Sequence, residues 1–102
     1  MPGVKEYRFH PLAWQELEEA DSWYFSHSYE VSLDFLNDLY AAVEDVALEP
    51  RRWPAYLHGT RRLVMQRFPF SVIYLDAPDL ITIIAVAHGK RKPGYWKDRL
   101  HS

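Results

Sequence analysis

The 102-residue chain contains no cysteine, which excludes a disulfide framework and any metal site built on thiolates. Its four glycines are isolated from one another, so no glycine-rich loop is present to hold a nucleotide phosphate. The five histidines show neither an HxH nor an HExxH spacing, and no serine stands in a nucleophile elbow. We therefore expect no bound metal and no cofactor, and find little to indicate a conventional hydrolase.

Long apolar runs are also missing. The longest, residues 81–87, has about seven residues, far short of the roughly 20 that a membrane-spanning helix needs. The first six residues lack the apolar core of a signal peptide. With 48% hydrophobic and 25% charged residues, we expect a single globular domain over residues 1–102, located in the cytoplasm and without membrane contact.

Basic residues are nearly absent from the first half of the chain. Residues 1–50 hold two basic and eleven acidic residues, whereas residues 51–102 hold ten basic and three acidic ones. This asymmetry predicts a basic surface that is open to anionic partners. The alternative is that the two halves neutralise each other where they touch.

Hydrophobic periodicity predicts two helices after a short first strand. Residues 5–9 alternate polar and aromatic side chains, and Pro11 suits the first turn of a helix. The acids of that helix, Glu16, Glu18, Glu19 and Asp21, are expected on a solvated face. Ser28 is a suitable N-cap for a second helix over residues 29–48, which Pro50 ends. So short a connection predicts an antiparallel helical hairpin.

Three further strands follow, at about residues 60–68, 70–75 and 81–87. They are close enough in sequence to pair as an antiparallel meander. Residues 81–87 are almost all β-branched or aliphatic, which is typical of a central strand buried on both faces. The order β-α-α-β-β-β predicts an α+β fold, in which the N-terminal strand and the meander form one sheet covered by the helical hairpin.

The candidate functional residues are basic and aromatic. We expect the start of the second strand and the end of the fourth to lie at neighbouring ends of the sheet, which would bring Arg61 or Arg62 to His88 and Arg91. Arginine binds phosphate through two hydrogen bonds, and Tyr or Trp can stack on a base. The target-binding set is Arg61, Arg62, Arg67, His88, Lys90, Arg91, Lys92, Tyr95, Trp96 and Lys97, with Arg99 nearby.

The same residues have a purely structural interpretation. Tyr95 and Trp96 could pack the tail onto the sheet, while the lysines and arginines keep it soluble. A catalytic interpretation also exists, because metal-free RNA cleavage needs a group to activate the 2'-hydroxyl, one to protonate the leaving oxygen, and a cation for the phosphorane charge. His88 and Tyr95 could fill the first two roles, with Arg62 and Arg91 supplying positive charge.

Several short motifs follow one another in a fixed order along nearly the whole chain. They are His-Pro before the first helix, an Ala-x-x-Glu-Leu-x-x-Ala-like helix over residues 13–24, Glu-Pro-x-x-Trp-Pro at 49–54, Arg-Arg-Leu at 61–63, Arg-Phe-Pro-Phe-x-Val-x-Tyr at 67–74, and Ala-Val-x-His followed by basic residues, Pro and Trp at 85–96. In this order and spacing the sequence resembles the RelE/ParE superfamily of toxins from type II toxin–antitoxin systems.

The resemblance implies a β-α-α-β-β-β fold and a cognate antitoxin, ParD-like or similar, which is often acidic and wraps the toxin in a hetero-oligomer. It leaves the target open, because the RelE branch cleaves mRNA on the ribosome and the ParE branch poisons DNA gyrase. Where the RelE branch usually has a basic residue on the third strand, this chain has Ser71. The Phe-Pro-Phe phrase and the Pro-x-x-Trp tail look more like ParE.

Three hypotheses follow. The first is a ParE-like toxin that inhibits DNA gyrase by binding and has no enzymatic activity. The second is a RelE-like, metal-independent endoribonuclease that uses Arg62, His88, Arg91 and Tyr95. The third is a basic module that binds nucleic acid directly, which the acidic helical hairpin would hinder by limiting approach to one face.

Overall fold

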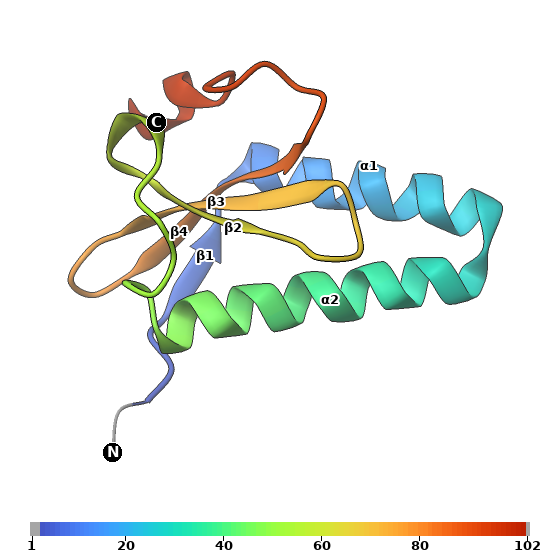
Figure 1. The fold of residues 1–102 in the computed structure, drawn as a ribbon, viewed down its shortest axis with the longest axis horizontal. Helices are drawn as coiled ribbons and strands as arrows, with labels where there is room; N and C mark the ends of the chain where they lie inside the picture. Colours follow the sequence, from blue (N-terminus) through green and yellow to red (C-terminus); the bar gives the residue numbers. More distant parts are fainter. Residues whose placement is uncertain (1–2, 102) are drawn as a thin grey trace.

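Two helices lie between one N-terminal strand and three C-terminal strands in the computed structural model, which describes residues 3–101 (Figure 1). The elements are β1 (Tyr7–Phe9), α1 (Pro11–His27), α2 (Tyr29–Leu48), β2 (Arg61–Val64), β3 (Phe70–Asp76) and β4 (Ile81–His88). Short 3-10 helices cover Leu57–Gly59 and Lys97–His101. The predicted order is confirmed.

The strands form one sheet in the order β1-β4-β3-β2. β1 pairs parallel to β4, and the other neighbouring strands are antiparallel. β4 is therefore a central strand, and Ile81, Ile83, Ile84, Ala85 and Val86 are all buried. The predicted α+β architecture and the central position of this strand are confirmed.

Both helices cover the same face of the sheet (Figure 1). On α1 the residues Ala13, Leu17 and Ala20 recur at helical spacing and are buried. The Ser28 hydroxyl accepts a hydrogen bond from the Val31 amide at 3.3 Å, so the predicted N-cap of α2 is correct. The hydrophobic core between the helices and the sheet also includes Phe35, Leu39, Val43, Val46, Val72, Tyr74 and Ile83.

The other face of the sheet is covered by the C-terminal tail. Trp96 is only 1% exposed and packs in a second cluster with Ile73, Ile84 and Ala85. A β-bulge makes room for this, because Ile73 pairs with Ala85 and Tyr74 with Ile83, which leaves Ile84 without a partner on β3. Ile84 and Ala85 can then both face the tail. The sheet is thus buried on both sides at β4.

The strand directions correct one expectation. β2 and β4 each run antiparallel to β3, so they run in the same direction. Arg61 at the start of β2 pairs with Tyr74, which pairs with Ile83 near the start of β4. His88 lies at the opposite end, paired with Phe70. We expected the start of β2 and the end of β4 to lie at neighbouring ends of the sheet. They lie at opposite ends.

Over residues 3–101, no helix combines the length and the apolar character that crossing a bilayer would require.

Replacement of Trp96 tests the structural role of the tail. Trp96→Ala removes a buried ring and should lower the free energy of unfolding by about 3–5 kcal/mol, measured by urea denaturation. Trp23→Ala is the matched control, because Trp23 is 59% exposed, and should change it by less than about 0.5 kcal/mol. Equal effects of the two substitutions would contradict the packing of the tail onto the sheet.

Candidate functional site

Two consecutive turns fold the chain back after β4. The Arg91 amide donates to the His88 carbonyl at 3.0 Å, and the Tyr95 amide donates to the Lys92 carbonyl at 3.1 Å. Pro93 and Gly94 lie between Lys92 and Tyr95. Gly94 has a φ of 80°, as the third residue of a type II turn requires. The turns return Tyr95 and Trp96 to the sheet and leave the intervening cations at its end.

The returning tail encloses a small polar cavity of about 110 Å³. Its wall combines the tail with β2, β3 and the loop before β2. The lining residues are Tyr56, Arg62, Ser71, Ile73, Ala87, His88, Gly89, Arg91, Lys92, Pro93, Tyr95 and Trp96.

Both arginines that line the cavity make cation–π contacts with aromatic rings. The Arg62 guanidinium lies 4.1 Å from the ring centre of Tyr56, and that of Arg91 lies 3.8 Å from the ring centre of Tyr95. Neither side chain forms an ion pair or a hydrogen bond within residues 3–101. Cation–π contact orders a guanidinium without neutralising it, so both charges remain available.

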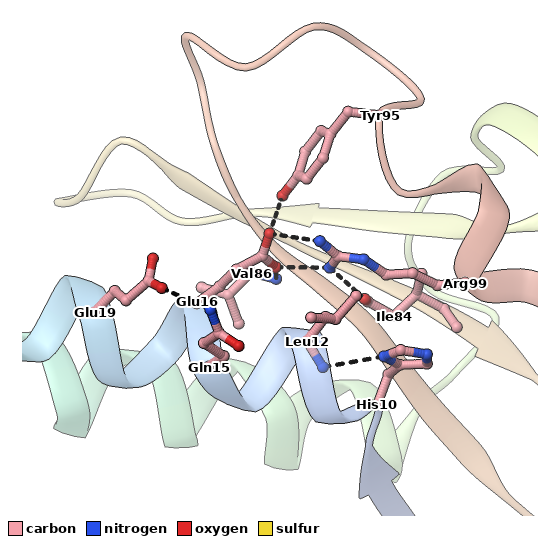
Figure 2. A network of polar contacts seen from close by, with 9 residues as sticks. All are labelled: His10, Leu12, Gln15, Glu16, Glu19, Ile84, Val86, Tyr95 and Arg99. Atoms are coloured by element: carbon pink, nitrogen blue, oxygen red, sulfur yellow. Dashed lines mark hydrogen bonds and ion pairs between the residues drawn. The ribbon is translucent and has the colours of Figure 1, made fainter. Parts of the chain in front are cut away.

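A buried polar network pins the tail to α1 (Figure 2). The Glu16 carboxylate accepts a hydrogen bond from the Tyr95 hydroxyl at 2.6 Å and two from the Arg99 guanidinium, each at 2.9 Å. The Glu16 and Arg99 side chains are only 13% and 12% exposed. A bidentate pair of this kind fixes geometry as well as charge, so the position of Tyr95 depends on α1.

The same network completes the edge of β4. β1 ends at Phe9, beside Ile83, so the later residues of β4 have a neighbouring strand only on the β3 side. Glu16 accepts a hydrogen bond from the Val86 amide at 3.1 Å, and Arg99 donates to the Ile84 carbonyl at 3.0 Å. Buried backbone groups must find partners, and here two side chains supply them.

The network also sets two pKa values. Burial raises the pKa of Tyr95, and the hydrogen bond to Glu16 and its negative charge raise it further. Burial alone would lower the pKa of Arg99, but the hydrogen bond and charge of Glu16 outweigh it and raise that pKa. Tyr95 therefore stays protonated at neutral pH, and its hydroxyl donates a hydrogen bond to Glu16, so the proton that a general acid would transfer is already engaged.

The cavity brings together six of the ten residues proposed for target binding. Lys90 and Lys97 do not line it but are exposed on the same tail. Trp96 lies beneath the cavity and is almost fully buried, so it cannot offer a stacking face to a base. The residues that converge are Arg62, His88, Arg91, Lys92, Tyr95 and Trp96.

Arg61 and Arg67 lie elsewhere. Arg61 faces the helical side of the sheet and donates to the carbonyl of Trp53 at 2.6 Å. Arg67 donates two hydrogen bonds to Asp38 on α2, at 2.8 and 3.0 Å. Neighbouring residues of a strand point to opposite faces, so of the Arg61-Arg62 pair only Arg62 reaches the tail.

Glu16 corrects the prediction that the acids of α1 lie on a solvated face. Glu18 and Glu19 are exposed as expected, whereas Asp21 is half-buried and accepts a hydrogen bond from the Ser32 hydroxyl. Glu16 is largely buried. The sequence carried a signal for this, because position 16 is three residues after Ala13 and four before Ala20, within the apolar stripe. A carboxylate in such a stripe needs a buried cation, and Arg99 supplies it.

Both interpretations of the charge asymmetry hold, for different residues. Arg67 and Arg99 from the basic half pair with Asp38 and Glu16 from the acidic half. In contrast, the basic side chains of the turn after β4 make no ion pair within residues 3–101. They are Lys90, Arg91 and Lys92. A basic surface therefore remains where the tail leaves β4.

The described region contains no metal-binding geometry. Within residues 3–101, no three or more His, Asp or Glu side chains come together in an arrangement that could hold a metal ion.

Comparison with known proteins places these features in context. The family model described as "ParE toxin of type II toxin-antitoxin system, parDE" matches residues 7–93. The solved structure titled "Chromosomal ParDE TA system from P. aeruginosa" is similar in fold, with a TM-score of 0.72 and 19% sequence identity over 83% of this chain and 96% of that chain. No curated protein matches the sequence.

Replacement of Glu16 tests the network. Glu16→Gln leaves the Arg99 cation buried without its counter-charge and should lower the free energy of unfolding by about 3 kcal/mol, measured by urea denaturation. Glu18→Gln, two residues further along α1 and exposed, is the control and should change it by less than about 0.5 kcal/mol. A Glu16→Gln variant as stable as wild type would show that the pair contributes little.

Alkaline pH tests the buried tyrosines. Burial raises the pKa of Tyr74 to about 12, and the pKa of Tyr95 is also raised, whereas an unfolded tyrosine titrates near about 10. The folded state thus keeps protons that the unfolded chain loses. The free energy of unfolding should therefore be fully maintained below about pH 10 and fall as the pH rises through 12. Urea denaturation at a series of pH values measures this slope.

The matched variants for this experiment are Tyr95→Phe and Tyr29→Phe. Tyr95→Phe should flatten the alkaline loss, whereas Tyr29→Phe, at a 59% exposed position, should follow the wild-type curve. An identical slope in Tyr95→Phe and wild type would mean that Tyr95 does not contribute.

Proposed function

The chain belongs to the ParE toxin family of type II toxin–antitoxin systems, and from that premise we propose that it stops growth by binding and inhibiting DNA gyrase. The action is one of binding, with no chemical step on RNA. It takes place in the cytoplasm, where gyrase works on DNA.

The observation that carries this proposal is the exposed cationic turn after β4, which has no ion-pair partner among residues 3–101. Lys90, Arg91 and Lys92 are exposed, and the turns and the Glu16 network hold them on a rigid support. Preorganised charge at the end of a rigid strand is suited to a protein partner, because little conformational entropy is lost on binding. The proposed contact surface is this turn with Arg62, His88, Tyr95 and Lys97.

The competing hypothesis of a RelE-like endoribonuclease has less support. The Tyr95 hydroxyl is engaged with Glu16 and keeps its proton at neutral pH. His88 accepts a hydrogen bond from the Lys90 amide through Nδ1, at 3.0 Å. Ser71 lines the cavity in place of a cation. Arg62 and Arg91 could bind RNA phosphate, but an available acid–base pair is missing from the set.

We further propose a cognate antitoxin, ParD-like or similar, that neutralises the toxin in a hetero-oligomer. An acidic segment that orders on binding would complement the basic turn. Exposed aromatic side chains near the turn between α1 and α2 could pack against apolar side chains of such a partner. They are Trp23, Phe25 and Tyr29, each 59% exposed.

Charge reversal on the tail tests the gyrase proposal. Arg91→Glu with Lys92→Glu should abolish growth arrest on expression, together with inhibition of supercoiling by purified gyrase, because like charges then face the target. The control is Arg51→Glu with Arg52→Glu, an exposed basic pair outside the cavity, which should remain toxic. If the Arg91→Glu, Lys92→Glu variant arrested growth as strongly as wild type, the tail would not be the surface that acts on the target.

The same expression experiment separates the competing targets. Trapped gyrase–DNA complexes and an SOS response support the gyrase proposal, whereas codon-phased mRNA cuts without DNA damage would replace it with the ribonuclease. Growth should recover when an acidic antitoxin is co-expressed. Salt-dependent binding of the isolated chain to free nucleic acid, without either effect, would favour a direct nucleic-acid module.

A further inference from the structure

The cavity under the tail concentrates positive charge without any acid. Four basic side chains line it, namely Arg62, His88, Arg91 and Lys92, and no Asp or Glu is among its lining residues. Glu16 and Glu19 line a separate cavity that shares His88, Arg91 and Tyr95 with the first. Arg91 forms no ion pair with either carboxylate. Bringing Arg62, Arg91 and Lys92 together without a counter-charge costs free energy, which a bound anion would relieve.

The two guanidiniums are oriented for a ligand. Arg62 lies over Tyr56 and Arg91 over Tyr95, and each ring contact leaves the N–H groups at the edge of the guanidinium free. Tyr95 is fixed in turn by its 2.6 Å hydrogen bond to Glu16. The arginine over it is therefore held in place through α1, so less conformational entropy is lost when a ligand binds.

Ser71 adds a neutral donor. It lies on β3, opposite Ala87 of β4, and lines the same cavity. Its hydroxyl makes no hydrogen bond to any group in residues 3–101. A half-buried hydroxyl beside cations is well suited to donate to an anionic oxygen.

We propose that this cavity is a binding site for a phosphate group. Guanidinium forks match two phosphate oxygens at once, and the cavity of about 110 Å³ has room for one tetrahedral anion. A carboxylate, with one negative charge and two oxygens, would leave more of the surrounding positive charge uncompensated. The chemistry favours phosphate for that reason.

The site recognises the phosphate and not a base. Trp96 is buried beneath the cavity, and one face of Tyr56 and one face of Tyr95 are covered by arginines. The phosphate could belong to a nucleic-acid backbone or to a small phosphorylated molecule. In either case affinity should not depend on which base is attached.

The phosphate site lies within the surface proposed to contact gyrase, and its biological role rests on that proposed function. There it would hold a backbone phosphate of the DNA that gyrase carries. The binding of phosphate itself depends only on this chain and can be measured without gyrase.

The test is an NMR titration of the purified chain with sodium phosphate, against sodium chloride at equal ionic strength. We expect saturable shifts of the Ser71, Gly89 and Arg91 amides with phosphate alone. Arg62→Gln and Arg91→Gln should each weaken binding about tenfold, as expected for the loss of a charge-assisted contact. Arg52→Gln is the matched control, since Arg52 also stacks on an aromatic ring, 4.8 Å from the centre of Trp53, but lies outside the cavity.

A second arm identifies the source of the phosphate. A five-residue thymidine oligomer is compared with the same oligomer carrying an uncharged methylphosphonate backbone. Tighter binding of the charged oligomer than of inorganic phosphate assigns the site to a nucleic-acid strand, and tighter binding of inorganic phosphate assigns it to a small molecule. Replacing the thymines by adenines should leave the affinity unchanged.

Several outcomes would overturn the phosphate site: no saturable binding of either probe, wild-type affinity in both Arg62→Gln and Arg91→Gln, or an equal loss in Arg52→Gln. A supercoiling assay on the same wild-type protein keeps the two proposals apart. Inhibition of gyrase without phosphate binding rejects only the phosphate site. Phosphate binding without inhibition rejects only the gyrase proposal.

Discussion

The hydrogen-bonded pair of Glu16 and Arg99 is the constraint on which the C-terminal third of the molecule depends. It joins the first helix to the last turn of the chain, across 83 positions of sequence. It also satisfies backbone groups of β4 that the three-residue β1 is too short to reach. Without it, the tail would be held by its turns and by the packing of Trp96, Tyr95 and Leu100 on the sheet, and the Tyr95 ring beside Arg91 would lose its hydrogen bond to α1.

A rigid support changes what the basic turn can do. Cations on a mobile tail attract anions only over long range and with little selectivity. Here Arg91 is stacked on Tyr95, Tyr95 is bonded to Glu16, and Glu16 belongs to a helix packed in the main core. The arrangement gives the toxin a cationic surface of defined geometry. The Tyr95 hydroxyl is occupied by its hydrogen bond to Glu16, which favours a role in binding over a role in catalysis.

Local chemistry accounts for the parts of the fold and site that could be predicted. Ser28 and Pro50 bound the second helix through capping and backbone restriction. The apolar run of β4 indicates burial on both faces. The relation between Arg62 and the tail could not be derived this way, because the strand directions place the start of β2 and His88 at opposite ends of the sheet.

The sequence by itself determined the order of elements, the central strand, the acidic and basic halves, and the resemblance that led to the toxin family. The first three follow from periodicity, turn chemistry and composition, which act over a few residues at a time, whereas the resemblance rests on short motifs that match a known family in order and spacing. Only the tertiary structure decided which charges stay unpaired: Arg67 and Arg99 are paired by acids from distant helices, whereas Arg62 and Arg91 remain free to bind. Pairing of charges depends on distance in space, and that distance is set by the packing of the whole chain.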